Sequence, residues 1–138
     1  MTRLAAALAG LLTLLVGASA ASGGAAARPT GDTVEITIHY SRFEPEAIVV
    51  EPGQTVRFVI SNTDPIDHEF ILGDHEVQRV HEEGTEAHHP PRPGEVSVAP
   101  GETVVTTYTF PESPGQLIFG CHLPGHYDFG MRGTVTIG

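Results

Sequence analysis

The stretch TVEITIHY, residues 33–40, alternates apolar and polar side chains without interruption. Its apolar positions share one parity: Val34, Ile36, Ile38 and Tyr40. Successive side chains of a β-strand point to opposite faces, so this two-residue period predicts a half-buried strand. The same alternation recurs in TVRFVIS, residues 55–61, and the β-branched stretch TVVTTYTF, residues 103–110, is also typical of a strand.

Shorter β-prone segments lie around these stretches, and turn signals such as Pro52-Gly53 and Pro100-Gly101 separate most of them. These segments are residues 47–51, 68–72, 95–98, 116–120 and 133–137. Short strands punctuated in this way indicate an all-β fold. We predict a Greek-key β-sandwich of about seven to eight strands.

Residues 73–94 break this rhythm. They hold four histidines, several glutamates and the pair Pro90-Pro91, with no apolar period. We predict a long His-rich loop insertion here, with at most a helical turn around residues 77–83. No helix of about ten residues is expected anywhere in the mature part of the chain.

The N-terminal segment differs in composition from the rest. An apolar run over residues 4–16 precedes the small-x-small pattern of residues 18–20 (ASA), which signal peptidase accepts. The run is shorter than the roughly 20 residues of a membrane-spanning helix, so residues 1–20 are predicted to be a signal peptide, with an uncleaved anchor as the alternative. Residues 21–32 are then a flexible leader, and residues 33–138 one secreted or periplasmic domain with no membrane insertion.

The charge of the chain is strongly acidic. Seventeen Asp and Glu oppose seven Arg, there is no Lys, and the formal net charge is −10. Nucleic acid is therefore excluded as a partner, because phosphate contacts need a basic face. An acidic surface favours a basic docking partner.

Cys121 is the single cysteine. A lone thiol in an exported domain can be an inert buried side chain, an intermolecular bridge, a nucleophile or a metal ligand. The segment CHLPGHYDFGM, residues 121–131, also contains His126 and Met131, and its glycines and proline suit a tight loop. With His68, these residues form the donor set of two histidines, one cysteine and a weak methionine that is typical of redox copper, whereas zinc has no need of methionine.

The pattern Asn-x5-His-x-Phe over residues 62–70, followed by Cys-x4-His-x4-Met over residues 121–131, resembles the cupredoxin family of plastocyanin- and azurin-like type 1 blue-copper proteins. The resemblance covers roughly residues 33–138. It implies four copper ligands, namely the first histidine, the thiolate, the second histidine and the axial thioether: His68, Cys121, His126 and Met131. It also implies an apolar patch at the edge of the second histidine, for which Leu123, Pro124 and Phe129 are the candidates.

One position departs from the family pattern. Plastocyanin-like members usually have Asn or Ser just after the first histidine, where its side chain helps tie the two ligand loops together. This chain has Glu69 there, which leaves that brace open. The insertion at residues 73–94 also lies outside the minimal family plan.

Structural alternatives exist for each candidate ligand. Cys121 can be a buried thiol, Met131 a core filler and His68 a surface histidine. His122 is interpreted as non-ligating, because adjacent residues of an extended strand point to opposite faces. Multicopper oxidases have an HCH motif, with a histidine on each side of the cysteine. Here Gly120 precedes Cys121, and the chain is too short for the other domains of such an oxidase, so this class of enzyme is not expected.

The histidines of the insertion suggest a second site for Cu(II) or Zn(II). They are His75, His81, His88 and His89, with several glutamates among them. The alternative is a solvated acidic loop, or a docking surface, in which these histidines bind no metal.

We therefore predict a monomeric extracytoplasmic type 1 copper protein that transfers single electrons through Cu(II)/Cu(I) and is not an enzyme. Its expected partners are redox proteins such as a c-type cytochrome or a copper oxidase. The alternative function is extracytoplasmic copper binding for storage, delivery or resistance, with residues 75–89 as an additional site. A fold that has lost copper is a third reading, against which the complete ligand set argues.

Overall fold

The computed structural model describes residues 25–84 and 90–138, and these form nine strands and one helix. In chain order the elements are β1 (Thr33–His39), β2 (Arg42–Glu44), β3 (Ala47–Val50), β4 (Thr55–Asn62), β5 (His68–Gly73), α1 (His75–Gly84), β6 (Glu95–Val98), β7 (Thr103–Thr109), β8 (Gly115–Gly120) and β9 (Arg132–Ile137). The predicted signal peptide, residues 1–20, lies outside the described residues. Within the described part, no helix is long and apolar enough to cross a membrane.

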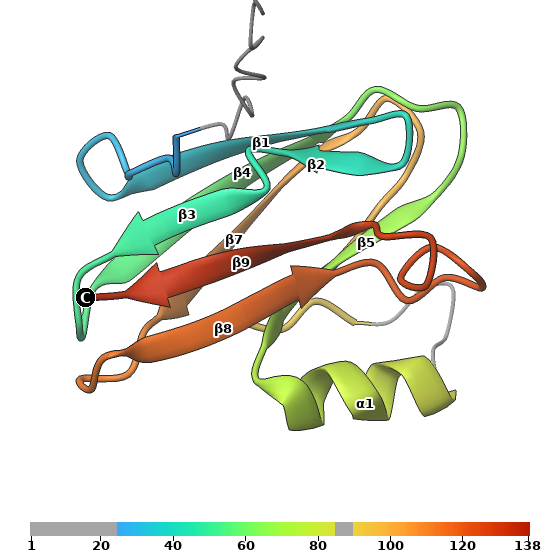
Figure 1. Ribbon diagram of the computed structural model, residues 1–138. Coiled ribbons are helices and arrows are strands. Elements are labelled where there is room, and N and C mark those ends of the chain that lie inside the picture. Colours follow the sequence, from blue (N-terminus) through green and yellow to red (C-terminus); the bar gives the residue numbers. More distant parts are fainter. Residues whose placement is uncertain (1–24, 85–89) are drawn as a thin grey trace, which may run out of the picture.

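The strands form two sheets that face each other (Figure 1). One sheet has the order β2-β1-β4-β7 and the other β3-β9-β8-β5-β6. The predicted all-β sandwich is confirmed. The strand count over the described residues is nine rather than seven or eight. The additional strand is β2, which at three residues is too short to show a period in the sequence.

The alternation in the sequence corresponds to burial in the structure. Along β1 the apolar positions are buried and the polar ones exposed, and β4 shows the same pattern over its first half. By contrast, all six residues of β5 are buried, because β6 and β8 flank it and α1 packs against it. The two-residue period therefore identifies strands with one exposed face, such as β1 and β4, more clearly than β5, which is buried on both faces.

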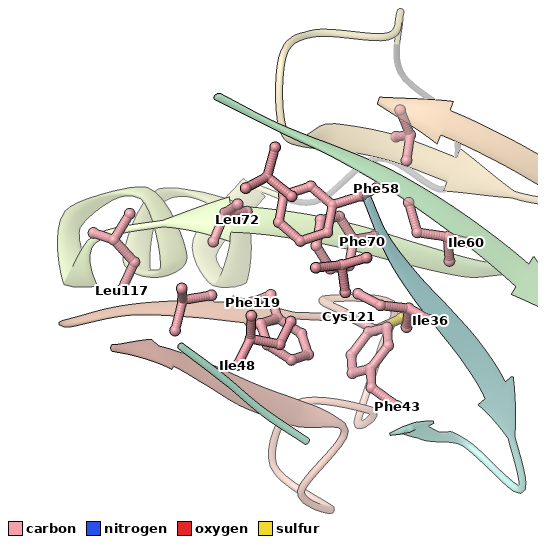
Figure 2. Close-up of a cluster of buried hydrophobic side chains, with 14 of the residues drawn as sticks. Ile36, Phe43, Ile48, Phe58, Ile60, Phe70, Leu72, Leu117, Phe119 and Cys121 are labelled. Atoms are coloured by element: carbon pink, nitrogen blue, oxygen red, sulfur yellow. The ribbon is translucent and has the colours of Figure 1, made fainter. Parts of the chain in front are cut away.

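The core between the sheets is rich in phenylalanine (Figure 2). The Phe70 ring, fully buried, has its centroid 5.4 Å from that of Phe58, 5.4 Å from that of Phe119 and 6.0 Å from that of Phe43. Burial of such a ring contributes about 1.5–3 kcal/mol to folding. Cys121 belongs to the same buried cluster, so the end of β8 is held by the core.

The prediction of a loop without a helix of about ten residues is wrong, because α1 spans ten residues. Asp74 caps its first turn, with Oδ1 accepting from the backbone N–H groups of Glu76 and Val77. Gln78, the buried residue of the helix, attaches it to the sandwich: its Nε2 donates to the Ile71 and Ile118 carbonyls of β5 and β8. Because the buried residue of the helix is polar, a search for apolar periodicity does not identify this segment as a helix.

Part of the segment predicted as a leader pairs with the sandwich. The backbone N–H of Ala27 donates to Ala47 O, and the N–H of Val49 donates to Ala27 O, both at 2.8 Å. These two bonds place residue 27 beside β3, at the edge of the five-stranded sheet.

Candidate metal centre

Three connections meet at one end of the sandwich (Figure 1). They are the β1–β2 turn at residues 40–41, the β4–β5 loop at residues 63–67 and the β8–β9 loop at residues 121–131. His68 is the first residue of β5, and Cys121 directly follows β8. Because β5 and β8 are hydrogen-bonded neighbours, the two residues start from adjacent strands.

Backbone hydrogen bonds close the β8–β9 loop on itself. The N–H of Cys121 donates to Met131 O at 3.1 Å, and the N–H of Met131 donates to His126 O at 2.9 Å. Gly125 and Gly130 have φ values of 84° and 91°, which side-chain-bearing residues rarely adopt. The predicted tight loop that bends these residues toward one another is therefore present.

Three candidate ligands lie together. The Sγ of Cys121 is 3.2 Å from Nδ1 of His126 and 3.9 Å from Nδ1 of His68, and all three donor atoms lie within 4.8 Å of one another. His68 and Cys121 are completely buried, and His126 is partly exposed. Over the described residues this is the one group of three or more such side chains with metal-ligand spacing.

Met131, the fourth predicted ligand, is fully buried in the hydrophobic cluster. Its backbone forms hydrogen bonds with Cys121 and His126, the two other candidate ligands of the same loop. The structure thus brings residue 131 to the centre, and coordination by its thioether stays a prediction.

Burial controls the state of the cysteine. Desolvation raises the pKa of the Cys121 thiol to about 11, and the nearby charge of Glu69 acts in the same direction. Two backbone N–H groups, one of them from Glu69 at 3.3 Å, oppose the shift without cancelling it. The thiol is therefore protonated at neutral pH, and a bound cation is needed to stabilise the thiolate that copper requires.

The first histidine has a carboxylate partner. Nε2 of His68 lies 3.0 Å from Oδ2 of Asp64, which also accepts the backbone N–H of Ser41. Burial lowers the pKa of His68, although Asp64 partly offsets this effect. Burial would raise the pKa of Asp64, but its hydrogen bonds with Ser41, Tyr40 and His68 together hold it below its usual range. Sequence reasoning missed Asp64, whose only signal was its place in the turn after Asn62.

The second histidine lies beside exposed aromatic side chains. His126 lines a shallow pocket of about 230 Å³ with Tyr40, Arg42 and Phe129. Tyr40 and Phe129 are 83% and 81% exposed, so an apolar surface does adjoin this histidine. Of the three residues predicted for the patch, Phe129 and Pro124 are exposed, whereas Leu123 is wrong, because its side chain packs into the core.

Glu69 does connect the two ligand loops. Its backbone N–H donates to Cys121 Sγ at 3.3 Å, and its Oε2 accepts the backbone N–H of His122 at 3.3 Å. The brace between the ligand loops is therefore present although residue 69 is not Asn or Ser, because the buried carboxyl group of Glu69 makes it.

His122 points away from the donor cluster and toward α1. Its ring nitrogens lie 2.7 Å from Glu82 Oε2 and 2.8 Å from Gln78 Oε1, and its ring stacks on Tyr127 with centroids 4.5 Å apart. The interpretation of this residue as non-ligating agrees with these contacts. They also show that α1, which the sequence analysis did not predict, holds His122, the residue next to Cys121.

The proposed second site in the insertion is not assembled by the described residues. His75 is exposed at the start of α1. Nδ1 of His81 donates to Val77 O in its own helix at 2.8 Å, and its Nε2 lies 3.4 Å from Glu95 Oε2. His88 and His89 lie outside the described residues. A second metal site therefore stays a prediction.

The donor set of the first cluster fits copper. Two imidazole Nδ1 atoms and one sulfur, from two histidines and one cysteine, lie together, and the buried thioether of Met131 belongs to the same loop as two of them. This combination suits both oxidation states of copper, whereas structural zinc sites use four strong ligands.

Comparison with known proteins gives concordant results. A family model described as "Copper binding proteins, plastocyanin/azurin family" matches residues 32–138. The copper-resistant cuproprotein CopI of Pseudomonas aeruginosa is 30% identical over 169 residues, covering 92% of each chain. The CopI of Rubrivivax gelatinosus is 37% identical over 99 residues, which are 70% of this chain and 59% of that relative.

Solved structures agree on the fold. The reduced auracyanin of Roseiflexus castenholzii has a TM-score of 0.64 at 24% identity, covering 78% of this chain and 97% of that chain. Auracyanin A of Chloroflexus aurantiacus, a blue copper protein, has a TM-score of 0.59 at 26% identity, covering 77% of this chain and 98% of that chain.

Proposed function

Because the chain belongs to the plastocyanin/azurin family of copper-binding proteins, we propose that it transfers single electrons outside the cytoplasm through one type 1 copper ion. The proposed ligands are the three clustered groups and the adjoining thioether: His68, Cys121, His126 and Met131. When bound, copper supplies the one-electron Cu(II)/Cu(I) couple. The role involves no change in the bonds of a substrate, so it is not enzymatic.

The observation that carries this proposal is the burial of the donor cluster. His68 and Cys121 are 0% exposed, and hydrogen bonds hold both: His68 to Asp64, and Cys121 to the Glu69 backbone. Ligands held in this way exclude water and keep their orientation in both oxidation states. Such a site favours retention of the metal over many redox cycles rather than its rapid release.

The surface beside His126 supports the proposed exchange of electrons with a partner. The exposed rings of Tyr40 and Phe129 flank its pocket, and Arg42 adds one positive charge. A partly exposed ligand bordered by apolar rings suits brief docking of a redox protein, such as a c-type cytochrome or a copper oxidase.

The test is a visible absorption spectrum of the protein, expressed from the full chain and purified from the periplasm, after one equivalent of Cu(II). We expect an intense blue or green thiolate band that is absent in Cys121→Ser and retained in the control His75→Ala, whose side chain is exposed on α1. Copper content should stay at one per chain through repeated reduction and reoxidation. Bound copper without this band would overturn the assignment.

Copper resistance by binding and delivery is the second candidate. The supporting observation is that a relative named as a copper-resistant cuproprotein matches 92% of this chain. A carrier should bind more than one copper per chain or yield its copper quickly to a chelator. Replacement of the four insertion histidines by alanine should lower the stoichiometry of a carrier, but leave the spectrum of an electron-transfer protein unchanged.

A further inference from the structure

The carboxylate of Asp64, in the β4–β5 loop, joins the β1–β2 turn to His68 of β5. Its Oδ1 accepts the backbone N–H of Tyr40 at 2.7 Å, and its Oδ2 accepts the N–H of Ser41 at 2.7 Å. The same Oδ2 lies 3.0 Å from Nε2 of His68. Asp64 is 7% exposed, and its own N–H donates to Oδ1 of Asn62 at 2.9 Å, which fixes its backbone.

The partners of the carboxylate determine which nitrogen of His68 carries hydrogen. Both oxygens of Asp64 already accept amide N–H groups, so the group acts as an ionised acceptor. Nε2 of His68 must then be the donor, which leaves the lone pair of a neutral ring on Nδ1. Nδ1 is the atom that faces Cys121 Sγ, so Asp64 selects the tautomer in which His68 can bind a metal.

The same carboxylate holds the β1–β2 turn. Tyr40 and Ser41 have φ values of 50° and 52°, a region that residues with side chains rarely occupy. Their N–H groups are both bound by Asp64, which stabilises this conformation. Just beyond the turn, Arg42 donates to the Phe129 carbonyl of the second ligand loop at 2.7 Å. Asp64 is thus linked to His68 directly and to the other ligand loop through the turn.

We propose that Asp64 is a positioning residue of the metal centre, which orients His68 through Nε2 and by its negative charge favours Cu(II) over Cu(I). This inference rests on the copper site proposed above. An anionic hydrogen-bond acceptor increases the electron-donating strength of a ligand imidazole, and loss of such a partner typically costs 10–100-fold in metal affinity. The higher charge of Cu(II) makes it the more sensitive of the two states.

The decisive variant is Asp64→Asn, which retains the side-chain shape and removes the charge. We expect Cu(II) affinity to fall about tenfold more than Cu(I) affinity, which corresponds to a rise of about 59 mV in the one-electron reduction potential. The matched control is Asp128→Asn, which removes one negative charge from an exposed position of the second ligand loop. Both variants are measured as copper-loaded protein by spectroelectrochemistry and by competition with chelators specific for each oxidation state.

A second measurement keeps the inference testable if Asp64→Asn does not fold. Proton–nitrogen NMR of the metal-free wild-type protein should show the Nε2 hydrogen of His68 deshielded and slow to exchange. A ring hydrogen on Nδ1, or an Nε2 hydrogen that exchanges freely, would overturn the inference. So would a folded Asp64→Asn whose potential is unchanged or moves no more than that of Asp128→Asn. If the wild type has no thiolate band, it is instead the proposed function that fails, and the NMR result still decides the tautomer.

Discussion

Replacement of Asn62 by alanine should destabilise the fold more than its small change in apolar area suggests. Asn62 is 2% exposed, and its Nδ2 donates to the carbonyls of Ile66, Val98 and Ala99 at 2.8, 3.0 and 3.2 Å. Its Oδ1 accepts the N–H of Asp64. The NH2 group has two hydrogens, so these contacts amount to two donated hydrogen bonds and one accepted bond. At about 1 kcal/mol for each, Asn62→Ala should lower the free energy of unfolding by about 3 kcal/mol.

The assay is urea denaturation of the metal-free protein. With a slope of about 2 kcal/mol/M, a loss of about 3 kcal/mol lowers the midpoint by about 1.5 M. The control is Ser61→Ala in the same strand, because its hydroxyl pairs with Thr103 on the exposed face and its loss should cost about 0.5 kcal/mol or less. A midpoint of Asn62→Ala within about 0.5 M of the wild type, at unchanged slope, would refute this reasoning. The amide would then not hold the β4–β5 loop.

Three further predictions concern the helix, a close approach in the core and pH. Gln78→Met removes the amide that attaches α1 to β5 and β8 and should cost about 2–3 kcal/mol in urea denaturation. The control Arg79→Met loses only exposed ion pairs and should shift the urea midpoint much less. Gly133→Ala would place a Cβ atom against the Phe119 ring and should lower the melting temperature. The control Gly115→Ala has open space around the new Cβ atom and should leave the melting temperature unchanged. Equal melting temperatures of the two variants would show that residue 133 does not lie so close to Phe119. Burial is the largest cause of lowered pKa values, relative to an ordinary 6.5, in three histidines: His68, His122 and His126. As the pH falls through 6.5, the unfolded chain therefore binds more protons than the folded protein. Metal-free protein should lose stability as the pH is lowered from about 7 to about 5. A urea midpoint that rises as the pH is lowered would show that the sign is wrong.

The strands and the sulfur-containing loop were predictable because their signals are local. The alternation in residues 33–40 corresponds to β1, and the spacing of residues 121–131 corresponds to a loop that returns Met131 to the Cys121 backbone. The helix α1 was not predictable in this way, since its buried residue is the polar Gln78. Leu123 was misplaced on the surface, because sequence proximity to a ligand does not tell which way a loop side chain points.

By itself the sequence determined the all-β sandwich class, the positions of eight of the nine strands along the described chain and the residue types of the metal centre. These properties depend on residues that are close together in the sequence. The two-residue alternation of apolar side chains and the five-residue spacing of the candidate ligands in the loop do not depend on how the strands pair. Only the tertiary structure decided the partners of those residues. The bond from Tyr40 to Asp64 spans 24 residues, and that from Glu69 to Cys121 spans 52. Such pairs depend on sheet register and on the path of each connecting loop, which no local pattern encodes.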